Sequence, residues 1–316
     1  MSEATGNIFL LRSGFGKEAE TFTPEDEAAV SSFIPPARPW KGPDGADGLR
    51  LEVKGGTDTF ICSLCPSSFD PAWSLHALGL LPDWGAALAL RQSAGRGQLR
   101  RSWSSPLGNL HVSFKLPASG LFSSSSATVL LALLLSEAFE TLGLHLRLKW
   151  PNDLVLLTDR GYAKLGGMLL EEKNGARIAG LGVNCLHMPE NALLREEAAL
   201  PPAVLPKNFA PRAPVTLWLE LVKKIKEIYN ERFKDTQHSD LLRLAERRLL
   251  WRGEEVRIDD PSAPVLTGIP VGLSEEGGLL LRIKNNAGGE DIYELVSGGI
   301  ARMDSGYRQK RPHAEE

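Results

Sequence analysis

Residues 146–186, "LRLKWPNDLVLLTDRGYAKLGGMLLEEKNGARIAGLGVNCL", decide the fold of this chain. They contain four apolar runs separated by short turns, with "DRG" at 159–161 and "KNGA" at 173–176 supplying turn-forming residues. An Asn-Gly pair between apolar runs is a strong signal for a tight β-hairpin. The stretch therefore predicts a meander of antiparallel strands.

Segments on both sides of this meander have the patterns of further helices and strands. Serines 123–126 precede an apolar body that runs to Gly143, which predicts a buried helix with hydroxyl N-caps and a glycine C-cap. Apolar positions repeat every 3.6 residues over 215–234 and 239–250, and Asp70-Pro71 opens a shorter helix. Strands are predicted at 59–65, 86–92 and 109–117. We expect an α+β fold with a mixed, largely antiparallel sheet and packed helices.

Composition divides the chain into four parts. Residues 1–50 form an N-terminal extension with a strand at 7–13, a helix at 23–34 and a Pro/Gly-rich loop or linker at 35–48. This extension lacks the pattern of three helices and a β-wing that a DNA-binding head requires. Residues 51–250 form the main domain, and 251–304 form a small β-barrel of about five short strands. Residues 305–316 are a polar tail, which we expect to be disordered.

Composition and charge also limit the function. The chain has 316 residues and a formal net charge of −3, whereas a dedicated nucleic-acid binder usually has a basic excess. The most apolar run, "VLLALLL" at 129–135, is far shorter than the roughly 20 residues of a membrane span. Three cysteines and no secretory pattern predict a cytoplasmic protein. Cys62 and Cys65 form a CxxC without a second ligand pair, so we expect buried thiols, with metal or redox use as the minor alternative.

Three segments carry candidate chemistry. "RQSAGRGQLRRSW" (91–103) combines arginines with two glycines, and is compatible with a nucleic acid, a phosphate-bearing small molecule or solvent alone. "KWPNDL" (149–154) places Asn152 and Asp153 in a turn, where they serve local hydrogen bonds or a Mg²⁺ ion. "KLGGMLLEE" (164–172) puts Lys164 beside paired glycines, which mark a close approach of backbone or ligand. A lysine there could neutralise a carboxylate and a phosphate as they react.

Together, "GRGQLRRSWSSPLGNLHVS", "KWPND", "KLGGMLLE" and "GLGVN" resemble the biotin protein ligases in order and spacing. The resemblance covers about 68–303. It implies a class II synthetase-like core with a C-terminal SH3-like barrel. It also implies that biotin attacks the α-phosphate of ATP with Mg²⁺, giving biotinyl-5′-AMP and pyrophosphate. A lysine of a biotin carboxyl carrier protein then attacks this mixed anhydride. DNA and membranes are not expected partners, and a homodimer is compatible with the resemblance.

The resemblance also implies roles for individual residues. The catalytic residues are Lys164, Asp153 and Arg96. Biotin-binding positions are Ser68, Gln92, Arg96, Gly97, Gln98, Lys164, Gly166 and Gly167. Nucleotide-binding positions are Arg100, Arg101, Trp103, Asn152, Lys164 and Asn184, and Asn152 also helps to hold Mg²⁺ through the phosphates. These cations fit the chemistry, because the attacking carboxylate and the triphosphate repel one another.

Two departures from the family pattern leave alternatives open. The family loop usually reads GRGRxGRxW, but this chain has Gln98 in place of an arginine and Arg100 in place of a glycine. Ser68-Phe69-Asp70 stands where the family usually has Ser-Thr-Asn. The alternatives are a ligase for another acid such as lipoate or octanoate, a non-catalytic sensor of biotin or biotinyl-AMP, and, more distantly, a DNA-binding regulator. The lipoate-ligase loop Arg-Arg-x-Ser-Gly-Gly-Gly does not occur.

Overall fold

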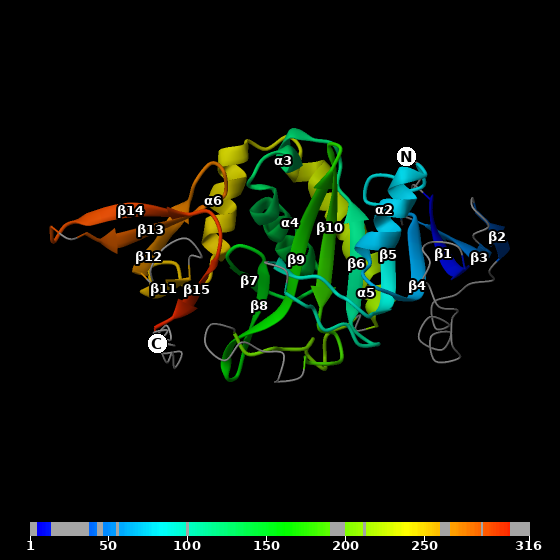
Figure 1. The fold of residues 1–316 in the computed structure, drawn as a ribbon, viewed down its shortest axis with the longest axis horizontal. Coiled ribbons are helices and arrows are strands. Elements are labelled where there is room, and N and C mark those ends of the chain that lie inside the picture. Colours follow the sequence, from blue (N-terminus) through cyan, green and yellow to red (C-terminus); the bar gives the residue numbers. More distant parts are fainter. Residues whose placement is uncertain are drawn as a thin grey trace, which may run out of the picture.

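The computed structural model describes residues 5–13, 38–42, 47–54, 57–98, 101–189, 200–210, 213–259, 266–285 and 287–303. Within them a ten-stranded sheet has the order β2-β3-β1-β4-β5-β6-β10-β9-β8-β7 (Figure 1). Its strands are β1 (Thr5–Ser13), β2 (Arg38–Lys41), β3 (Asp47–Lys54), β4 (Thr59–Cys65), β5 (Ala86–Gln92), β6 (Leu110–Lys115), β7 (Leu146–Lys149), β8 (Asp153–Thr158), β9 (Gly161–Lys173) and β10 (Ala176–Val183). The pairs β1–β4 and β4–β5 are parallel and the others are antiparallel.

Helices cover both faces of this sheet. They are α2 (Phe69–Ala77), α3 (Gly120–Ser123), α4 (Ala127–Thr141), α5 (Pro214–Ile228) with the π-helical turn η4 (Tyr229–Phe233), and α6 (His238–Arg248). Helix α2 lies in front of β4 and β5 in Figure 1, whereas α4 and α5 lie behind the sheet. The larger hydrophobic core lies between the sheet and α4, α5 and α6, and a smaller one lies under α2. The predicted α+β fold, its meander and its buried helix are confirmed.

The C-terminal part is a separate five-stranded antiparallel sheet, on the left of Figure 1. Its strands are β11 (Val256–Asp259), β12 (Leu266–Leu273), β13 (Leu279–Lys284), β14 (Glu290–Leu295) and β15 (Gly299–Arg302). It is joined to the main domain by buried and partly buried hydrogen bonds as well as packing. The indole nitrogen of Trp150 donates to the carbonyl oxygen of Gly277 at 2.9 Å, and Leu273 N donates to Glu246 Oε1 at 2.9 Å.

The structure corrects two local predictions. The Pro/Gly-rich segment 35–48 was expected to be a loop, but Arg38–Lys41 and the start of β3 form strands that extend the main sheet. Pro39 is tolerated because β2 is the edge strand, where the missing backbone N–H interrupts no hydrogen bond to a further strand. Ser126 does not cap α4, since its hydroxyl hydrogen-bonds Ser124 and His238 instead. The predicted helix at 23–34 and the tail at 305–316 lie outside the described residues.

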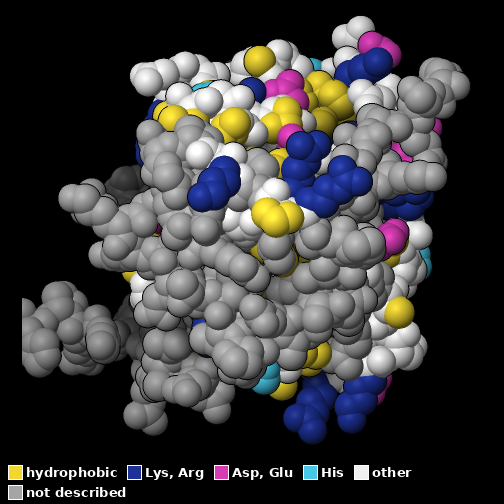
Figure 2. Space-filling view, turned by 90° about the vertical axis from the view of Figure 1, so that its right-hand side faces the viewer, with side chains coloured by type: hydrophobic (Ala, Val, Ile, Leu, Met, Phe, Trp, Pro, Cys, Tyr) yellow, Lys and Arg dark blue, Asp and Glu magenta, His cyan; other side chains and the backbone are white. Residues whose placement is uncertain are grey.

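The outer surface adds two observations. Figure 2 turns the β1–β3 side of the molecule toward the viewer, and the described Lys and Arg side chains there lie in several separate places. No described helix has the length and apolar character needed to cross a membrane.

Candidate active site

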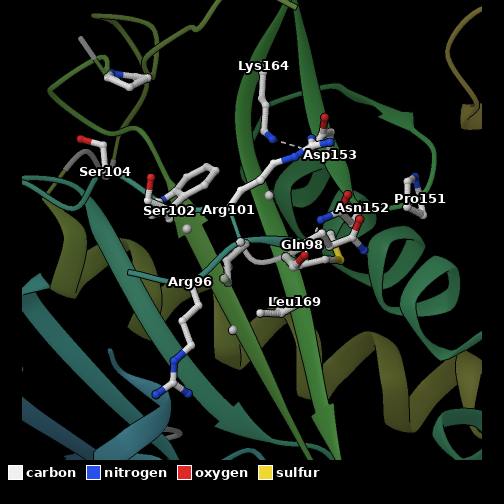
Figure 3. A pocket seen from close by; sticks show the side chains of 18 of the residues that line it. Arg96, Gln98, Arg101, Ser102, Ser104, Pro151, Asn152, Asp153, Lys164 and Leu169 are labelled. Carbon is white, nitrogen blue, oxygen red and sulfur yellow. Dashed lines mark hydrogen bonds and ion pairs between the residues drawn. The ribbon is translucent and has the colours of Figure 1, made fainter. Parts of the chain in front are cut away.

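A cavity of about 420 Å³ opens between the arginine-rich loop, the meander and the C-terminal sheet. It brings together most of the side chains that the sequence singled out, from segments far apart in the chain (Figure 3). The predicted residues that line it are Ser68, Gln92, Arg96, Gly97, Gln98, Arg101, Trp103, Asn152, Asp153, Lys164, Gly167 and Asn184. Arg100 lies outside the described residues, and Gly166 does not line the cavity.

The charged centre of the cavity is an aspartate between two lysines. Lys164 Nζ lies 2.6 Å from Asp153 Oδ1, and Lys149 Nζ lies 3.7 Å from Asp153 Oδ2. Burial by itself raises the pKa of Asp153, but the charges of Lys164 and Lys149 outweigh it, so the pKa lies below its ordinary value. Burial lowers the pKa of Lys149. Asp153 is therefore an ionised hydrogen-bond acceptor at neutral pH.

Local backbone features position this ion pair. The register between β8 and β9 shifts after Leu154, so that Val155 faces Lys164 while Asp153 faces Gly167. A Cβ on Gly167 would lie 3.5 Å from Lys164 Cε and 3.6 Å from Asp153 Oδ1, which is ordinary van der Waals contact, so Gly167 lies directly beside the ion pair. Lys164 is also fixed from outside the sheet, because its N–H donates to Pro201 O at 2.7 Å.

Gly166 has a different role from its neighbour. A Cβ there would come within 2.5 Å of the carbonyl oxygen of Gly182 on β10. Its missing side chain allows β9 and β10 to approach closely, and its predicted contact with biotin stays a prediction.

Two glycines of β10 shape the floor of the cavity. The ring of Phe69 occupies the space above Gly180, where an added Cβ would lie 2.6 Å from it. The indole of Trp103 covers Gly182 in the same way, with 2.5 Å to the nearest ring atom. Lys164 Nζ lies 5.3 Å from the centroid of the Trp103 ring, which links the aromatic floor to the charged centre.

Gly182 therefore gives a testable prediction. Gly182→Ala should displace the Trp103 indole and raise the KM for ATP about tenfold, because overpacking of a tight contact costs roughly 1–3 kcal/mol. Steady-state kinetics with ATP as the varied substrate would measure this change. Gly120→Ala is the control, since an added Cβ meets nothing within 4 Å there. An unchanged KM for ATP in Gly182→Ala would contradict a nucleotide contact by Trp103.

The arginine-rich loop is a narrow turn whose side chains point in different directions. Gly97 N donates to Arg101 O at 2.8 Å, and Trp103 N donates to Gly95 O at 2.8 Å. The Arg101 side chain extends toward Asp153, whereas Arg96 points away from it (Figure 3). The guanidinium of Arg96 pairs with Asp70 and, at 3.0 Å, with Glu171. Both arginines line the cavity, but Arg101 is the one directed at its charged centre.

A chain of polar side chains closes the other end of the cavity. Ser68 N donates to Gln92 Oε1 at 2.7 Å, and Gln92 Nε2 donates to Ser105 Oγ at 2.6 Å. The hydroxyls of Ser68 and Ser113 lie 2.7 Å apart and are buried. Both ends of the Gln92 amide are thus engaged within the protein, which fixes its orientation.

Asn152 is the candidate protein ligand for Mg²⁺. Its amide nitrogen donates to Met168 O at 2.6 Å, and its amide oxygen has no hydrogen bond to a described residue. The described residues contain no group of three or more His, Cys, Asp or Glu side chains arranged to hold a metal. One oxygen ligand fits Mg²⁺ that arrives on a nucleotide, since that ion keeps phosphates and water as most of its ligands.

The CxxC motif lies outside this chemistry. Cys62 and Cys65 are buried and free, with their sulfur atoms 3.7 Å apart. The hydrogen bond between them, followed by burial, raises the pKa of Cys65, so it remains a thiol. The expectation of buried thiols is confirmed.

Sequence reasoning missed several lining residues. His111 sits on β6 between the apolar positions that identified the strand, and Trp150 precedes the Asn-Asp turn. The C-terminal sheet adds Asp259 and residues 298–300. The polar position of His111 on a buried central strand was the available signal for that residue. The contribution of the C-terminal sheet depends instead on how this sheet packs against the main domain.

Comparisons with known sequences find similar proteins. Residues 70–187 match the model of the biotin/lipoate A/B protein ligase family. A biotin–[acetyl-CoA-carboxylase] ligase of Paracoccus denitrificans is 28% identical over 227 residues, which are 66% of this chain and 89% of that protein. The bifunctional ligase/repressor BirA of Salmonella typhimurium is 36% identical over 188 residues, which are 55% of this chain. The match spans 56% of the length of that BirA.

Solved structures lead to the same group. The biotin protein ligase of Aquifex aeolicus in complex with biotin and ATP superposes with a TM-score of 0.57 and 28% identity, over 77% of this chain and 97% of that one. A biotin acetyl coenzyme A carboxylase synthetase of Helicobacter pylori shares the fold at 22% identity and a TM-score of 0.51, over 75% and 98% of the two chains. Residues 70–187 are thus similar to the biotin/lipoate A/B protein ligase family, and the relatives and solved structures that the chain resembles are biotin ligases.

Proposed function

We propose that this chain is an ATP-dependent biotin protein ligase. The observation that carries the proposal is the juxtaposition of Lys164, Asp153 and Arg101 at a cavity of about 420 Å³. The similarity to biotin protein ligases, one of them solved with biotin and ATP, supports the choice of substrates. The reaction begins with attack of a biotin carboxylate oxygen on the α-phosphorus of ATP. A P–O bond forms to biotin as the bond to pyrophosphate breaks.

The side chains contribute mainly charge and orientation. Lys164 neutralises the carboxylate and the α-phosphate as they meet, and Asp153 holds the ammonium group of Lys164 in position. Arg101 adds a second cation from the loop. Mg²⁺ would arrive on the triphosphate, with the oxygen of Asn152 as a protein ligand, and would offset phosphate charge.

The second step transfers biotin to a lysine of a biotin carboxyl carrier protein. The attacking amine must lose a proton, and a lysine amine in water is largely protonated at neutral pH. Asp153 is ionised but weakly basic because of its lowered pKa, so we assign it to orienting the amine rather than to strong base catalysis. AMP leaves with the cleaved anhydride oxygen. We place the reaction in the cytoplasm, where the three free cysteines would stay reduced.

Pyrophosphate exchange tests the proposal directly. Purified protein with Mg-ATP and labelled pyrophosphate should incorporate label into ATP only when biotin is present. A carrier domain should then accept biotin from the preformed adenylate. Exchange with lipoate or octanoate in place of biotin would reassign the acid, and biotin binding without exchange would indicate a sensor.

Gln98 should affect how well the adenylate is retained. Gln98 lines the cavity in place of the arginine that is usual in the family, so the phosphate of biotinyl-AMP loses one forked cationic contact. Gln98→Arg should slow biotinyl-AMP release at least tenfold, since hydrogen bonds to charged groups contribute about 1.5–3 kcal/mol. The release rate would be measured by isolating the protein with labelled biotinyl-AMP by gel filtration and following loss of the label over time. Gln237→Arg adds the same charge at an exposed site, and equal release rates in all three proteins would contradict the prediction.

A further inference from the structure

A second cavity, of about 550 Å³, lies where the main domain meets the C-terminal sheet. Its walls come from β7 and β9, from the end of α6 with the turn at 249–254, and from β12 and β13. Helix α6 packs against both β7 and β12 and lies between the two sheets in Figure 1. Among the described residues, this cavity shares none of its lining with the active-site cavity. Its volume lies in the range of small-molecule sites.

The charge of this second cavity is positive. Its described lining contains four arginines and two glutamates, an excess of two positive charges in a chain whose net charge is −3. A further carboxylate, that of Glu290, lies 3.6 Å from Arg282 and offsets part of this excess. The six charged lining residues are Arg147, Arg247, Arg252, Arg282, Glu246 and Glu254.

Two of the arginines are held by carbonyl oxygens instead of carboxylates. Arg147 Nη1 donates to the carbonyl oxygen of Arg247 at 2.8 Å, and Arg252 Nε donates to that of Val271 at 3.2 Å. A neutral carbonyl fixes a guanidinium without cancelling its charge. The carboxylate of Glu246 lies 3.9 Å from Arg252 and also accepts a backbone N–H. Each guanidinium has five N–H donors, so both arginines keep donors for a ligand.

The uncharged part of the lining suits the body of a polar ligand. Tyr162 on β9 lines the cavity, and its hydroxyl makes no hydrogen bond to a described residue. Trp251 and Pro270 add apolar surface. The cavity therefore offers fixed cations at one place and a hydroxyl with apolar groups beside them.

We propose that this cavity is a second anion site, which binds a small molecule that carries a phosphate group. The planar forks of arginines match phosphate oxygens, and a phosphate monoester carries about −1.5 to −2 charge near pH 7. That charge matches the positive excess of the lining better than a single carboxylate does. The bound molecule would contact Arg147 of the main domain and Arg252 of the C-terminal part, and would hold the two together. This inference does not depend on the proposed ligase activity.

Calorimetry at low salt tests the site with three probes, which are inorganic phosphate, ribose 5-phosphate and malonate. Arg147→Gln and Arg252→Gln each remove one fixed cation, and Arg147→Lys keeps the charge without the fork. Arg243→Gln is the matched control, because Arg243 also lies on α6 but is exposed and pairs with Asp240 outside the cavity. Thermal unfolding of each protein, with and without phosphate, supplies a second measurement.

The two glutamine variants should each weaken phosphate binding about tenfold, since each loses charge-assisted hydrogen bonds. Arg147→Lys should have an intermediate affinity, and Arg243→Gln should bind like the wild type. Phosphate should raise the Tm of the wild type more than that of either glutamine variant, because it stabilises only the protein that binds it. Tighter binding of ribose 5-phosphate than of inorganic phosphate would identify the ligand as a phosphate ester, and equal binding would identify the free anion.

Three results would overturn the inference. Equal phosphate affinity in the wild type, Arg147→Gln and Arg252→Gln would place phosphate binding elsewhere, such as in the active site. Malonate binding as tight as that of phosphate would exclude a phosphate-selective site, and absence of phosphate binding to the wild type would exclude an anion site. If Arg147→Gln does not fold, Arg147→Lys gives the same comparison, because it keeps a donor beside the Arg247 carbonyl.

Discussion

Lys164→Ala should reduce biotin-dependent pyrophosphate exchange by about 10²–10³-fold, as expected for loss of a preorganised group that stabilises developing charge. The ammonium group of Lys164 lies 2.6 Å from Asp153 and faces the cavity where two anions must meet. Without it, the carboxylate and the α-phosphate repel one another and Asp153 adds a third negative charge. The loss of activity should appear mainly in kcat, because the positive charge of Lys164 stabilises the reacting groups most as the new P–O bond forms.

Two further variants make this result specific. Lys224→Ala is a matched control, since Lys224 has nearly the same side-chain exposure, 31% against 30%, and forms an ion pair of 2.7 Å with Glu227 on α5. Lys164→Arg keeps the charge but changes its geometry and should retain part of the activity. If Lys164→Ala and Lys224→Ala exchanged pyrophosphate equally well, Lys164 would have no part in adenylation.

The sequence motifs predicted the charged centre because their residues lie on neighbouring strands. Asp153 and Lys164 lie on β8 and β9, which are neighbours in the meander that the turns at 159–161 and 173–176 specify. A hairpin brings such residues together whatever the rest of the protein does. The exact pairing was not predictable, since turn residues do not specify the register shift after Leu154.

Features that depend on distant parts of the chain were beyond sequence reasoning. Arg96 lines the cavity, and its role at the reacting groups stays a prediction. Its ion pairs with Asp70 and Glu171, which come from a helix and a strand far away in sequence, were not predictable. The strand at Arg38–Lys41 was hidden because Pro and Gly usually indicate loops, and only an edge position permits it. His111 escaped notice since alternation directs attention to the apolar positions of β6.

The buried His111 should also make the protein sensitive to acid. Its pKa is about 4 in the folded protein and 6.5 in the unfolded chain, so between these values the unfolded state binds more protons. The contribution of uncharged His111 to the free energy of unfolding is therefore at its full value above pH 6.5 and falls as the pH drops toward 4. The loss amounts to about 3 kcal/mol of unfolding free energy, since each pKa unit corresponds to 1.36 kcal/mol.

Comparison of wild type with His111→Phe isolates this contribution. Carboxylates such as Asp153 also lose their ion pairs in acid, but both proteins share that loss. Urea unfolding at pH 7, 6, 5 and 4 measures the free energy of unfolding of both proteins. The stability of His111→Phe relative to the wild type should increase by about 3 kcal/mol from pH 7 to pH 4. Parallel curves would mean that His111 takes up a proton in the folded protein as readily as in the unfolded chain. The imidazole would then not be the desolvated, uncharged group that the cavity wall requires.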